Sequence, residues 1–505
     1  MKKILLFGAG KSATVLIDYL LKEALENEWK IIIADSNKTL IEEKVANNKL
    51  AEAVELDIND ASKRQILIEQ ADIVISMMPP ALHIFIAKDC IEFSKHLLTA
   101  SYADEEINKL HSGAVVKNIL FLCEMGLDPG IDHMSAMQLI DEIKEKGGVV
   151  TSFKSHCGGL VAPESDNNPW RYKISWNPRN IVLAGQAGAM YKIDNEIVNE
   201  KYQELFDSKR MVDIGSDEVK MLSYYPNRNS IPYIDLYGLN QANTFIRTTL
   251  RYPDFMYGWK NIVDLKLTDE NQEYETDGKT LQAVFKEHME KNNFGEWLNQ
   301  KLLESFAETK VLMENVMKLM EAEEEAEEQG KEIPENFLIV DEAGDLKDIQ
   351  IDEIKNNAAS VIAGQMHEAN LTLKQLFYLG MDDNNTVVNK GRCSAAVILQ
   401  FALEKKLMLA PGDKDMVVML HEIEYTLEAQ RFSVKSSLIV KGDDNIHTAM
   451  AKTVGLPLGI AAKLILNETI KLSGVHIPTS KEIYVPVLAE LQKHNIAFKE
   501  VWAEL

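Results

Sequence analysis

The sequence predicts an α/β protein in which a doubly wound parallel sheet is joined to a mixed α/β domain and a helical domain. Short apolar runs recur from the N-terminus at intervals of roughly 20 to 25 residues, with helical patterns between them. A glycine-rich turn separates the first run from the first helical pattern. Further along the chain, residues 280–410 are strongly helical in pattern.

The predicted strands of the parallel sheet are short and apolar on both faces, as buried parallel strands are. They comprise residues 4–7, 31–34, 54–57, 73–76, 97–100 and 119–122. Ligands of such sheets bind beyond the carboxyl ends of the strands. The predicted binding rim therefore consists of Gly8, Asp35, Asp57 and residues 77–80, 99–101 and 124–130.

The turn after the first strand matches the GxGxx(G/A) pattern of Rossmann dinucleotide-binding domains, since residues 8–13 read GAGKSA. Gly8 permits the tight turn, Gly10 lets a pyrophosphate approach the backbone, and Ala13 lets the helix pack near the strand. The helix N-terminus then offers free N–H groups to the phosphates.

The second strand ends in Asp35, 22 residues after Ala13. A carboxylate at this place can accept hydrogen bonds from both ribose hydroxyls of the adenosine half, and it would repel a 2′-phosphate. The cofactor is therefore NAD or NADP, with NAD(H) favoured by Asp35. Ser36, Asn37 and Lys38 follow, and they could bind a 2′-phosphate if Asp35 turned away.

The remaining pattern divides the chain into three predicted domains. The Rossmann domain comprises residues 1–133 and about 445–475, and the α/β substrate domain comprises 134–275, about 415–444 and 476–505. The helical domain covers about 276–414. Residues 416–440 alternate in polarity and predict a strand pair, whereas GQAGAM (185–190) lacks flanking strand and helix signals and is predicted to be a loop.

The charge balance argues against polyanionic partners. The chain has 54 basic and 78 acidic residues, a net charge of −24, whereas nucleic acids and anionic membranes attract basic surfaces. Residues 321–355 hold 14 acidic and 3 basic side chains and are predicted to form a solvated face. Residues 171–251 hold 11 basic and 9 acidic side chains, so an anionic ligand could bind there.

Cysteine usage and hydropathy indicate a protein of a reducing cytoplasm. The four cysteines lack CxxC spacing, which predicts neither a disulfide framework nor a zinc site. His83, His96, His133 and His156 lack metal-ligand spacing and are interpreted as structural, with no metal expected. No apolar stretch of about 18 residues predicts a membrane span. A homodimer is possible, since a dimer is the commonest oligomer of soluble proteins.

Several long motifs resemble the glutamate-forming saccharopine dehydrogenases, also called saccharopine reductases. These motifs are TASYADEEINKLH (99–111), GLDPGIDHMSAM (126–137), SHCGGLVAPESDNNPWRYKISWNPRN (155–180), YPNRNSIPYIDLYG (225–238), TFIRTTLRYPDFMYGW (244–259) and MAKTVGLPLGIAAKLIL (450–466). The resemblance covers roughly 1–265 and 385–505. It implies reversible conversion of saccharopine, NAD(P)+ and water to glutamate, 2-aminoadipate 6-semialdehyde and NAD(P)H, in lysine synthesis or breakdown.

The resemblance also implies which residues act. Asp128 would face substrate and nicotinamide ribose, holding the substrate amine or acting as a general base, with Tyr102 and Cys157 beside it. Cys157 needs no nucleophilic role, because the reaction has no covalent step. The expected substrate-binding residues are Ser101, Tyr102, Asp128, Cys157, Gly158, Arg228 and Arg247. The expected cofactor-binding residues are Gly8, Ala9, Gly10, Lys11, Ser12, Ala13, Asp35, Ser36, Asp57, Ile58, Met78, Pro79, Thr99, Ala100, Leu127, Asp128 and Trp176.

A tricarboxylate substrate requires cationic partners. Arg228 and Arg247 are the expected carboxylate clamps, while Arg171, Lys173 and Arg251 supply further positive charge. In a strand, Arg247 and Arg251 would point to the same face. The alternatives are a related reductive aminase such as carboxynorspermidine dehydrogenase and, outside the enzymes, a nucleotide-binding regulatory protein.

Overall fold

The computed structural model describes residues 1–207, 209–301, 303, 336–340, 346–350 and 370–505. The chain divides into two compact units. One unit comprises Met1–Asn167, Arg171–Met256 and Leu407–Leu505, and it contains both large sheets. The other comprises Asn168–Trp170 and Tyr257–Lys406.

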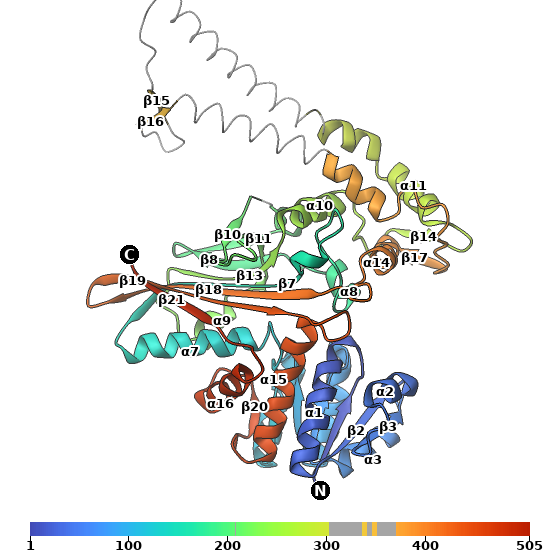
Figure 1. Ribbon diagram of the computed structural model, residues 1–505, viewed down its shortest axis with the longest axis vertical. Helices are drawn as coiled ribbons and strands as arrows, with labels where there is room; N and C mark the ends of the chain where they lie inside the picture. Colours follow the sequence, from blue (N-terminus) through green and yellow to red (C-terminus); the bar gives the residue numbers. More distant parts are fainter. Residues whose placement is uncertain (208, 302, 304–335, 341–345, 351–369) are drawn as a thin grey trace, which may run out of the picture. The chain divides into compact units, whose positions relative to one another are not determined.

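The first sheet is parallel, as the sequence predicts, and it has seven strands, one more than predicted (Figure 1). Its strands in spatial order are β20 (Gly474–His476), β6 (Leu120–Leu122), β5 (His96–Thr99), β4 (Ile73–Ser76), β1 (Lys3–Phe7), β2 (Lys30–Asp35) and β3 (Ala51–Glu55). The strand order reverses between β1 and β4, and this reversal is where ligands of doubly wound sheets bind. The predicted third strand, residues 54–57, begins three residues later than β3 and ends two residues later, so Asp57 lies in the loop that follows β3.

Apolar side chains point alternately to the two faces of this sheet, so helices cover both. Ile4 and Leu6 belong to a core shared with α1 and α15, whereas Leu5 and Phe7 belong to a core shared with α3 and α4. The helices of this layer are α1 (Thr14–Asn27), α2 (Lys38–Val45), α3 (Ala61–Gln70), α4 (His83–Glu92), α5 (Glu105–Asn108), α6 (His111–Val116) and α15 (Ala449–Leu466). The predicted doubly wound fold class is confirmed.

The second sheet has ten strands of mixed direction (Figure 1). Its main path is β10 (Met211–Asp213), β11 (Met221–Pro226), β13 (Thr244–Arg251), β7 (Val149–Val161), β18 (Asp415–Leu427), β19 (Gln430–Lys441) and β21 (Lys499–Glu504), with β8 (Ala189–Ile193), β9 (Glu196–Glu200) and β12 (Arg228–Asn229) beside it. Strands β18 and β19 pair antiparallel, which confirms the predicted strand pair. Helices α7 (Ile131–Glu145) and α16 (Lys481–Gln492) pack together, and α7 packs on β7 and β18.

Among the described residues, one helix is long and apolar enough to cross a membrane, namely α15. However, 72% of its 18 residues are buried inside the protein. It packs along α1 at two glycines. A Cβ on Gly455 would lie 2.9 Å from the backbone nitrogen of Leu16, and one on Gly459 would lie 2.5 Å from the ring of Tyr19. Asp415 accepts hydrogen bonds from the backbone N–H groups of Ala449 and Met450, so a carboxylate stabilises the N-terminus of this core helix.

The second unit contains helices and four short strands within its described residues. They include α11 (Leu281–Lys291), α14 (Ala395–Lys406), and the antiparallel pair β14 (Glu273–Glu275) and β17 (Arg392–Ser394), together with most of α10 (Pro253–Asp264). Small elements elsewhere are α8 (Pro178–Val182) and α9 (Pro232–Leu236). Strands β15 (Asn336–Val340) and β16 (Leu346–Gln350) pair antiparallel. The rest of the acidic segment 321–355, and most of residues 302–328 of the predicted helical domain, lie outside the described residues.

Candidate functional site

The glycine turn lies where the strand order of the parallel sheet reverses. Gly8 follows β1 with φ +95°, and a Cβ there would lie 3.1 Å from the carbonyl oxygen of Met77, the residue after β4. A Cβ on Gly10 would meet no protein atom within 4 Å. Gly8 is therefore required by the fold, whereas the backbone at Gly10 borders open space in which a ligand can approach closely.

Asp35 is held rigidly beside this turn. Its Oδ2 accepts the backbone N–H of Ala9 at 2.8 Å, and its Oδ1 accepts that of Asn37 at 2.9 Å. Lys44 on α2, which the sequence did not single out, donates to the carbonyl oxygen of Gly10 at 2.7 Å and to the hydroxyl of Thr14 at 2.8 Å. Burial lowers the pKa of Lys44 to about 8, although Asp18 and Asp35 oppose the shift. The turn thus has a fixed anion on one side and a fixed cation on the other.

The loop at 126–130 connects β6 to α7 in a conformation that only glycine allows. Gly130 has φ +146°, and a Cβ there would lie 2.1 Å from the carbonyl oxygen of Gly126. Asp128 and Pro129 form the turn between them, joined by a cis peptide bond. The backbone N–H of Gly130 donates to Asp132 Oδ1 at 2.6 Å, which ties the loop to the first turn of α7.

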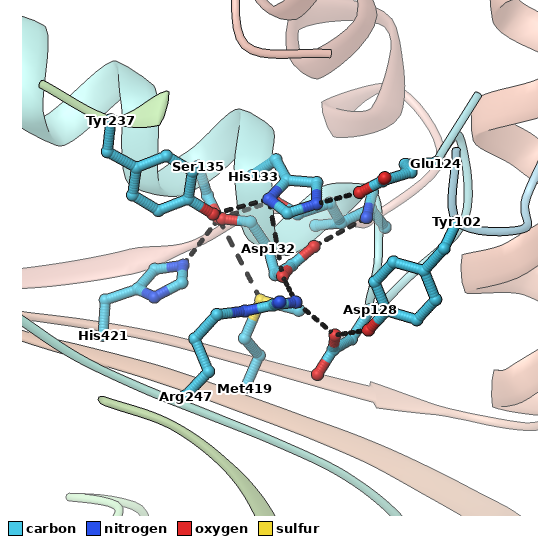
Figure 2. A network of polar contacts seen from close by, with 12 residues as sticks. Tyr102, Glu124, Asp128, Asp132, His133, Ser135, Tyr237, Arg247, Met419 and His421 are labelled. Atoms are coloured by element: carbon cyan, nitrogen blue, oxygen red, sulfur yellow. Dashed lines mark hydrogen bonds and ion pairs between the residues drawn. The ribbon is translucent and has the colours of Figure 1, made fainter. Parts of the chain in front are cut away.

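Two carboxylates share one arginine nitrogen at this loop (Figure 2). Nη2 of Arg247, on β13, donates to Asp128 Oδ1 at 2.7 Å and to Asp132 Oδ2 at 2.6 Å. The Arg247 guanidinium also lies 4.3 Å from the ring centre of Tyr233. Arg247 and Asp132 are buried, and the Asp128 side chain is 14% exposed. The pair therefore presents one carboxylate toward solvent-accessible space and keeps the other inside.

The pKa values of the two carboxyl groups shift in opposite directions because their partners differ. Burial and the negative charge of Asp132 raise the pKa of Asp128 to about 6, against the opposing effect of Arg247. Burial also acts to raise the pKa of Asp132, but His133, Arg247 and the N–H of Gly130 together hold it below its usual value. Asp132 is therefore the fixed charge, and Asp128 is the group that can exchange a proton near neutral pH.

A second buried chain of polar groups supports Asp132 (Figure 2). His133 Nε2 lies 2.8 Å from Glu124 Oε2, and Nδ1 lies 2.5 Å from the hydroxyl of Tyr237. Since an ionised carboxylate only accepts, Nε2 carries a proton. The imidazole stacks on Tyr233 at 5.5 Å between ring centres. His133 is thus held between Glu124 and Tyr237, and its neighbour Asp132 is part of the shared pair.

Tyr102 reaches Asp128 from the other side. Its hydroxyl donates to Asp128 Oδ1 at 3.5 Å, and the guanidinium of Arg228 lies 5.2 Å from its ring centre. Burial, reinforced by the charge of Asp128, raises the pKa of Tyr102 well above its usual value, so the phenol stays protonated. Three residues predicted together from separate motifs, Tyr102, Asp128 and Arg228, are thus neighbours.

Cys157 on β7 is buried near the same group. Burial raises the pKa of its thiol well above the usual value, and Asp128 and Asp132 raise it further. A neutral thiol agrees with the expectation that Cys157 is no nucleophile. Gly158 was expected to bind substrate, but a Cβ there would lie 2.4 Å from the carbonyl oxygen of Leu250. Strand packing, rather than the approach of a ligand, requires this glycine.

The cations expected to bind an anionic ligand fall into two groups. Arg247 is paired with two carboxylates, Arg171 lies 2.7 Å from Asp166, and Lys173 lies 2.5 Å from Asp413.

Arg228 and Arg251 make no ion pair within the part of the chain that the structure describes. Arg251 is buried; its Nη1 donates to the carbonyl oxygen of Leu250 at 2.7 Å, and its guanidinium lies 5.3 Å from the ring centre of Tyr172 and 5.5 Å from that of Phe255. A buried guanidinium without a carboxylate partner is a strong place for an anion.

Trp176 reaches this arginine indirectly, since its Nε1 donates to the hydroxyl of Tyr172 at 3.1 Å. Elsewhere on the rim, the Asp57 loop is held by Arg64, whose Nη1 donates to the carbonyl oxygen of Ile58 at 2.5 Å and whose Nε pairs with Asp89 at 2.6 Å. Within the described residues, no three metal-binding side chains gather into one group.

The sequence did not single out several buried or half-buried polar groups that lie next to predicted residues. They are Lys44, Asp132, Tyr233, Tyr237 and His421. Glu124 lies on the predicted rim, but its contact with His133 was not predicted. One signal was present, because Asp132 and His133 interrupt an α7 sequence whose other residues in the first turns are apolar or small. Charged residues inside an apolar helical stretch are buried with partners, and such partners cluster at functional sites.

Comparisons with known proteins agree across the chain. Residues 4–122 match the saccharopine dehydrogenase NADP binding domain, and residues 126–496 match the saccharopine dehydrogenase C-terminal domain. The saccharopine dehydrogenase [NADP(+), L-glutamate-forming] of Saccharomyces cerevisiae is 30% identical, with 99% of each chain covered. The alpha-aminoadipic semialdehyde synthase of Arabidopsis thaliana is 32% identical over 98% of this chain.

The chain spans less than half the length of that plant protein, 44% of it, and 47% of the bovine mitochondrial alpha-aminoadipic semialdehyde synthase, which is 29% identical. Among solved structures, the apo histidine-tagged saccharopine dehydrogenase (L-Glu forming) from Saccharomyces cerevisiae superposes with a TM-score of 0.76. It is 26% identical, and 100% of both chains is covered.

Proposed function

The chain belongs to the saccharopine dehydrogenase family, and from this we propose that it interconverts saccharopine, NAD(P)+ and water with L-glutamate, 2-aminoadipate 6-semialdehyde and NAD(P)H in lysine metabolism. The observation that carries the proposal is the carboxyl of Asp128, held by Arg247 and Tyr102. It lies just beyond β6, on the rim of the nucleotide-binding sheet. A proton-exchanging group at that rim is what an amine oxidation coupled to a dinucleotide requires.

The turn at residues 8–13 fits a dinucleotide. Open space at Gly10 and the N-terminus of the helical segment that begins at Lys11 suit a pyrophosphate, and Asp35 suits a ribose. When bound, the cofactor supplies the hydride acceptor of the oxidation. The matched family domain and the yeast relative carry NADP in their names. The fixed carboxylate of Asp35 nevertheless favours NAD(H) in this chain, since it would repel a 2′-phosphate, and we keep that preference as a proposal.

Asp128 is the proposed proton acceptor in the direction of saccharopine oxidation. The secondary ammonium must first lose a proton, which Asp128 can pass on to solvent, so that its carbon can give up a hydride. The water that adds to the resulting iminium must then lose a second proton to Asp128. With a pKa of about 6, the Asp128 carboxyl is ionised at neutral pH and can accept a proton. It can then return that proton to the amino nitrogen as the carbon–nitrogen bond breaks, giving glutamate and the aldehyde.

The remaining cations have different proposed roles. Arg228 and Arg251 bind substrate carboxylates, because neither has a carboxylate partner among the described residues and both lie near Asp128 or Cys157. Arg247 was expected from the sequence to clamp the substrate. Its shared nitrogen already serves Asp128 and Asp132, so we propose instead that it orients Asp128.

The experiment is an NAD(P)H absorbance assay with purified protein, saccharopine and either oxidised cofactor. Turnover in wild type and its loss in Asp128→Asn support the proposal. Absence of turnover with both cofactors would overturn it, and turnover of carboxynorspermidine instead would show a sister reductive aminase. The matched control is Asp141→Asn, also on α7 but away from the site. The Asp141 carboxylate accepts a hydrogen bond from the hydroxyl of Tyr484 at 2.6 Å.

We also propose that the protein works in a reducing compartment such as the cytoplasm. All four cysteines are free. Burial raises the thiol pKa of Cys90, Cys123 and Cys157, so these thiols remain in the unreactive protonated form.

A further inference from the structure

A buried histidine lies between the ends of two strands of the parallel sheet. His83 is the first residue of α4, and its Nδ1 lies 2.8 Å from the hydroxyl oxygen of Ser76, at the end of β4. Its Nε2 lies 2.8 Å from the hydroxyl oxygen of Ser101 and 3.3 Å from that of Thr99, at the end of β5. Ser101 immediately precedes Tyr102. The imidazole therefore connects the interior of the sheet to the rim where Asp128 lies.

The imidazole is neutral in this environment. It is 4% exposed, and within the described residues its hydrogen-bond partners are hydroxyl groups rather than carboxylates. Burial lowers the pKa of His83 to about 4, and the charge of Asp104 opposes the shift. A neutral imidazole has one N–H donor and one acceptor nitrogen, so each nitrogen has a definite role.

The backbone of Ser101 is fixed on both sides, so its hydroxyl is the part free to respond. The Ser101 N–H donates to Thr99 Oγ1 at 3.2 Å, and its carbonyl oxygen accepts the N–H of Glu124 at 3.0 Å. If Nε2 is the acceptor, the Ser101 hydroxyl donates its only hydrogen to His83 and cannot donate into the site. If Nε2 carries the proton, Ser101 accepts from His83, and its own hydrogen can be donated into the site.

We propose that His83 is a positioning residue whose Nε2–H holds the Ser101 hydroxyl as a hydrogen-bond donor toward a substrate carboxylate. In this arrangement Ser76 donates to Nδ1, Nε2 donates to Ser101, and Ser101 donates to the ligand, so all three bonds run in one direction. A carboxylate only accepts hydrogen bonds, so the opposite direction would leave Ser101 with nothing to donate. The inference rests on the proposed function, because the carboxylates of the substrate set the direction of the chain.

The test compares two amides at position 83. The side chain of His83→Gln reaches the place of Nε2 and can still donate to Ser101, whereas that of His83→Asn reaches only the place of Nδ1. We expect His83→Asn to raise the KM for saccharopine about tenfold, the effect of losing a hydrogen bond to a charged group. We expect His83→Gln to stay within about threefold of wild type, with the KM for the cofactor unchanged in both variants.

A double-mutant cycle separates positioning from general support of the fold. If His83 acts through Ser101, then His83→Asn adds nothing to the effect of Ser101→Ala, and the double variant has the KM of the single one. The inference would be overturned if the two substitutions multiplied their effects on the saccharopine KM in the double variant. It would also be overturned by equal KM values for the Asn and Gln variants, or by a parallel change in the cofactor KM. If His83→Asn fails to fold, Ser76→Ala gives the same cycle with Ser101→Ala, and the same outcomes apply.

The matched control is His96→Gln at the opposite end of β5, where His96 Nδ1 accepts the N–H of Leu120 at 2.9 Å. It should lower the melting temperature without changing the saccharopine KM, which shows that loss of a histidine in this sheet is not enough to change binding. Wild-type activity separates the two proposals. No turnover by wild type overturns the proposed function, whereas turnover with an unchanged KM in His83→Asn overturns only the role of His83.

Discussion

Replacing Asp132 by asparagine should move the acidic limb of the pH–rate profile. Asp128 and Asp132 accept from the same Arg247 nitrogen at 2.7 and 2.6 Å, so the two oxygens are at most 5.3 Å apart. At an effective dielectric constant of about 20, two unit charges at that distance repel by about 3 kcal/mol, or about two pKa units. Asp132→Asn removes this repulsion and leaves Arg247 to Asp128 alone, so both changes lower the pKa of Asp128.

The measurement is kcat/KM for saccharopine oxidation as a function of pH. In wild type it should rise as pH increases through about 6, because ionised Asp128 accepts the proton. In Asp132→Asn the same limb should appear one to two units lower, by roughly the repulsion removed. Because the pair titrates together, the limb reports an apparent value for the pair.

Asp141→Asn, on the same helix, should leave the limb in place. A limb in Asp132→Asn that stays near pH 6 or moves upward would refute the assignment of Asp128 as the titrating group. A melting curve for each variant accompanies the profile, because Arg247 loses one of two buried counterions and Asp132→Asn should be destabilised.

Three further predictions concern the cofactor, the substrate and acid stability. Asp35→Ser should shift the ratio of kcat/KM for NAD+ over NADP+ at least tenfold toward NADP+, because a tenfold change corresponds to about 1.4 kcal/mol of lost repulsion. An unchanged ratio, or a strong NADP+ preference in wild type, would contradict the role given to Asp35. Arg251→Met should raise the saccharopine KM by about 10- to 100-fold, whereas Arg171→Met, which removes another arginine stacked on a tyrosine, should not. Burial lowers the pKa of His421 to about 4, so the stability from its neutral form is complete above the unfolded pKa of about 6.5 and is lost as pH falls toward 4. Between pH 7 and pH 5, the free energy of unfolding measured with denaturant should therefore fall less in His421→Gln than in wild type. An equal fall in both proteins would contradict this role of His421.

The sequence predicted six of the seven strands of the parallel sheet because each is a local apolar run bounded by turn signals. Strand β20 was not predicted, since it has only three residues, Gly474–His476, and pairs with β6 some 350 residues earlier in the chain. Pairing between such distant segments leaves no local period in the sequence. The strand pair β18 and β19 was predictable because its alternation is local and long.

Within the candidate site, sequence motifs indicated Tyr102, Asp128 and Arg228, and the structure brings them together. What the motifs could not give is how charges are shared. Whether Arg247 faces a ligand or two aspartates depends on the packing of β13 beside α7, and a sequence pattern carries no distances. The opposite titration of Asp128 and Asp132 follows from the same geometry.

The return of the C-terminal segment to the nucleotide-binding sheet has a consequence for biosynthesis. Helix α15 covers Leu16 and Tyr19 of α1, and β20 adds the last strand beside β6. During translation, that apolar side of α1 is uncovered and the β6 edge is unpaired until residues 449–476 have been added. Exposed apolar faces and open strand edges bind other chains readily. We therefore expect the partly synthesised chain to associate with other chains more readily than the complete fold until residues 449–476 have left the ribosome.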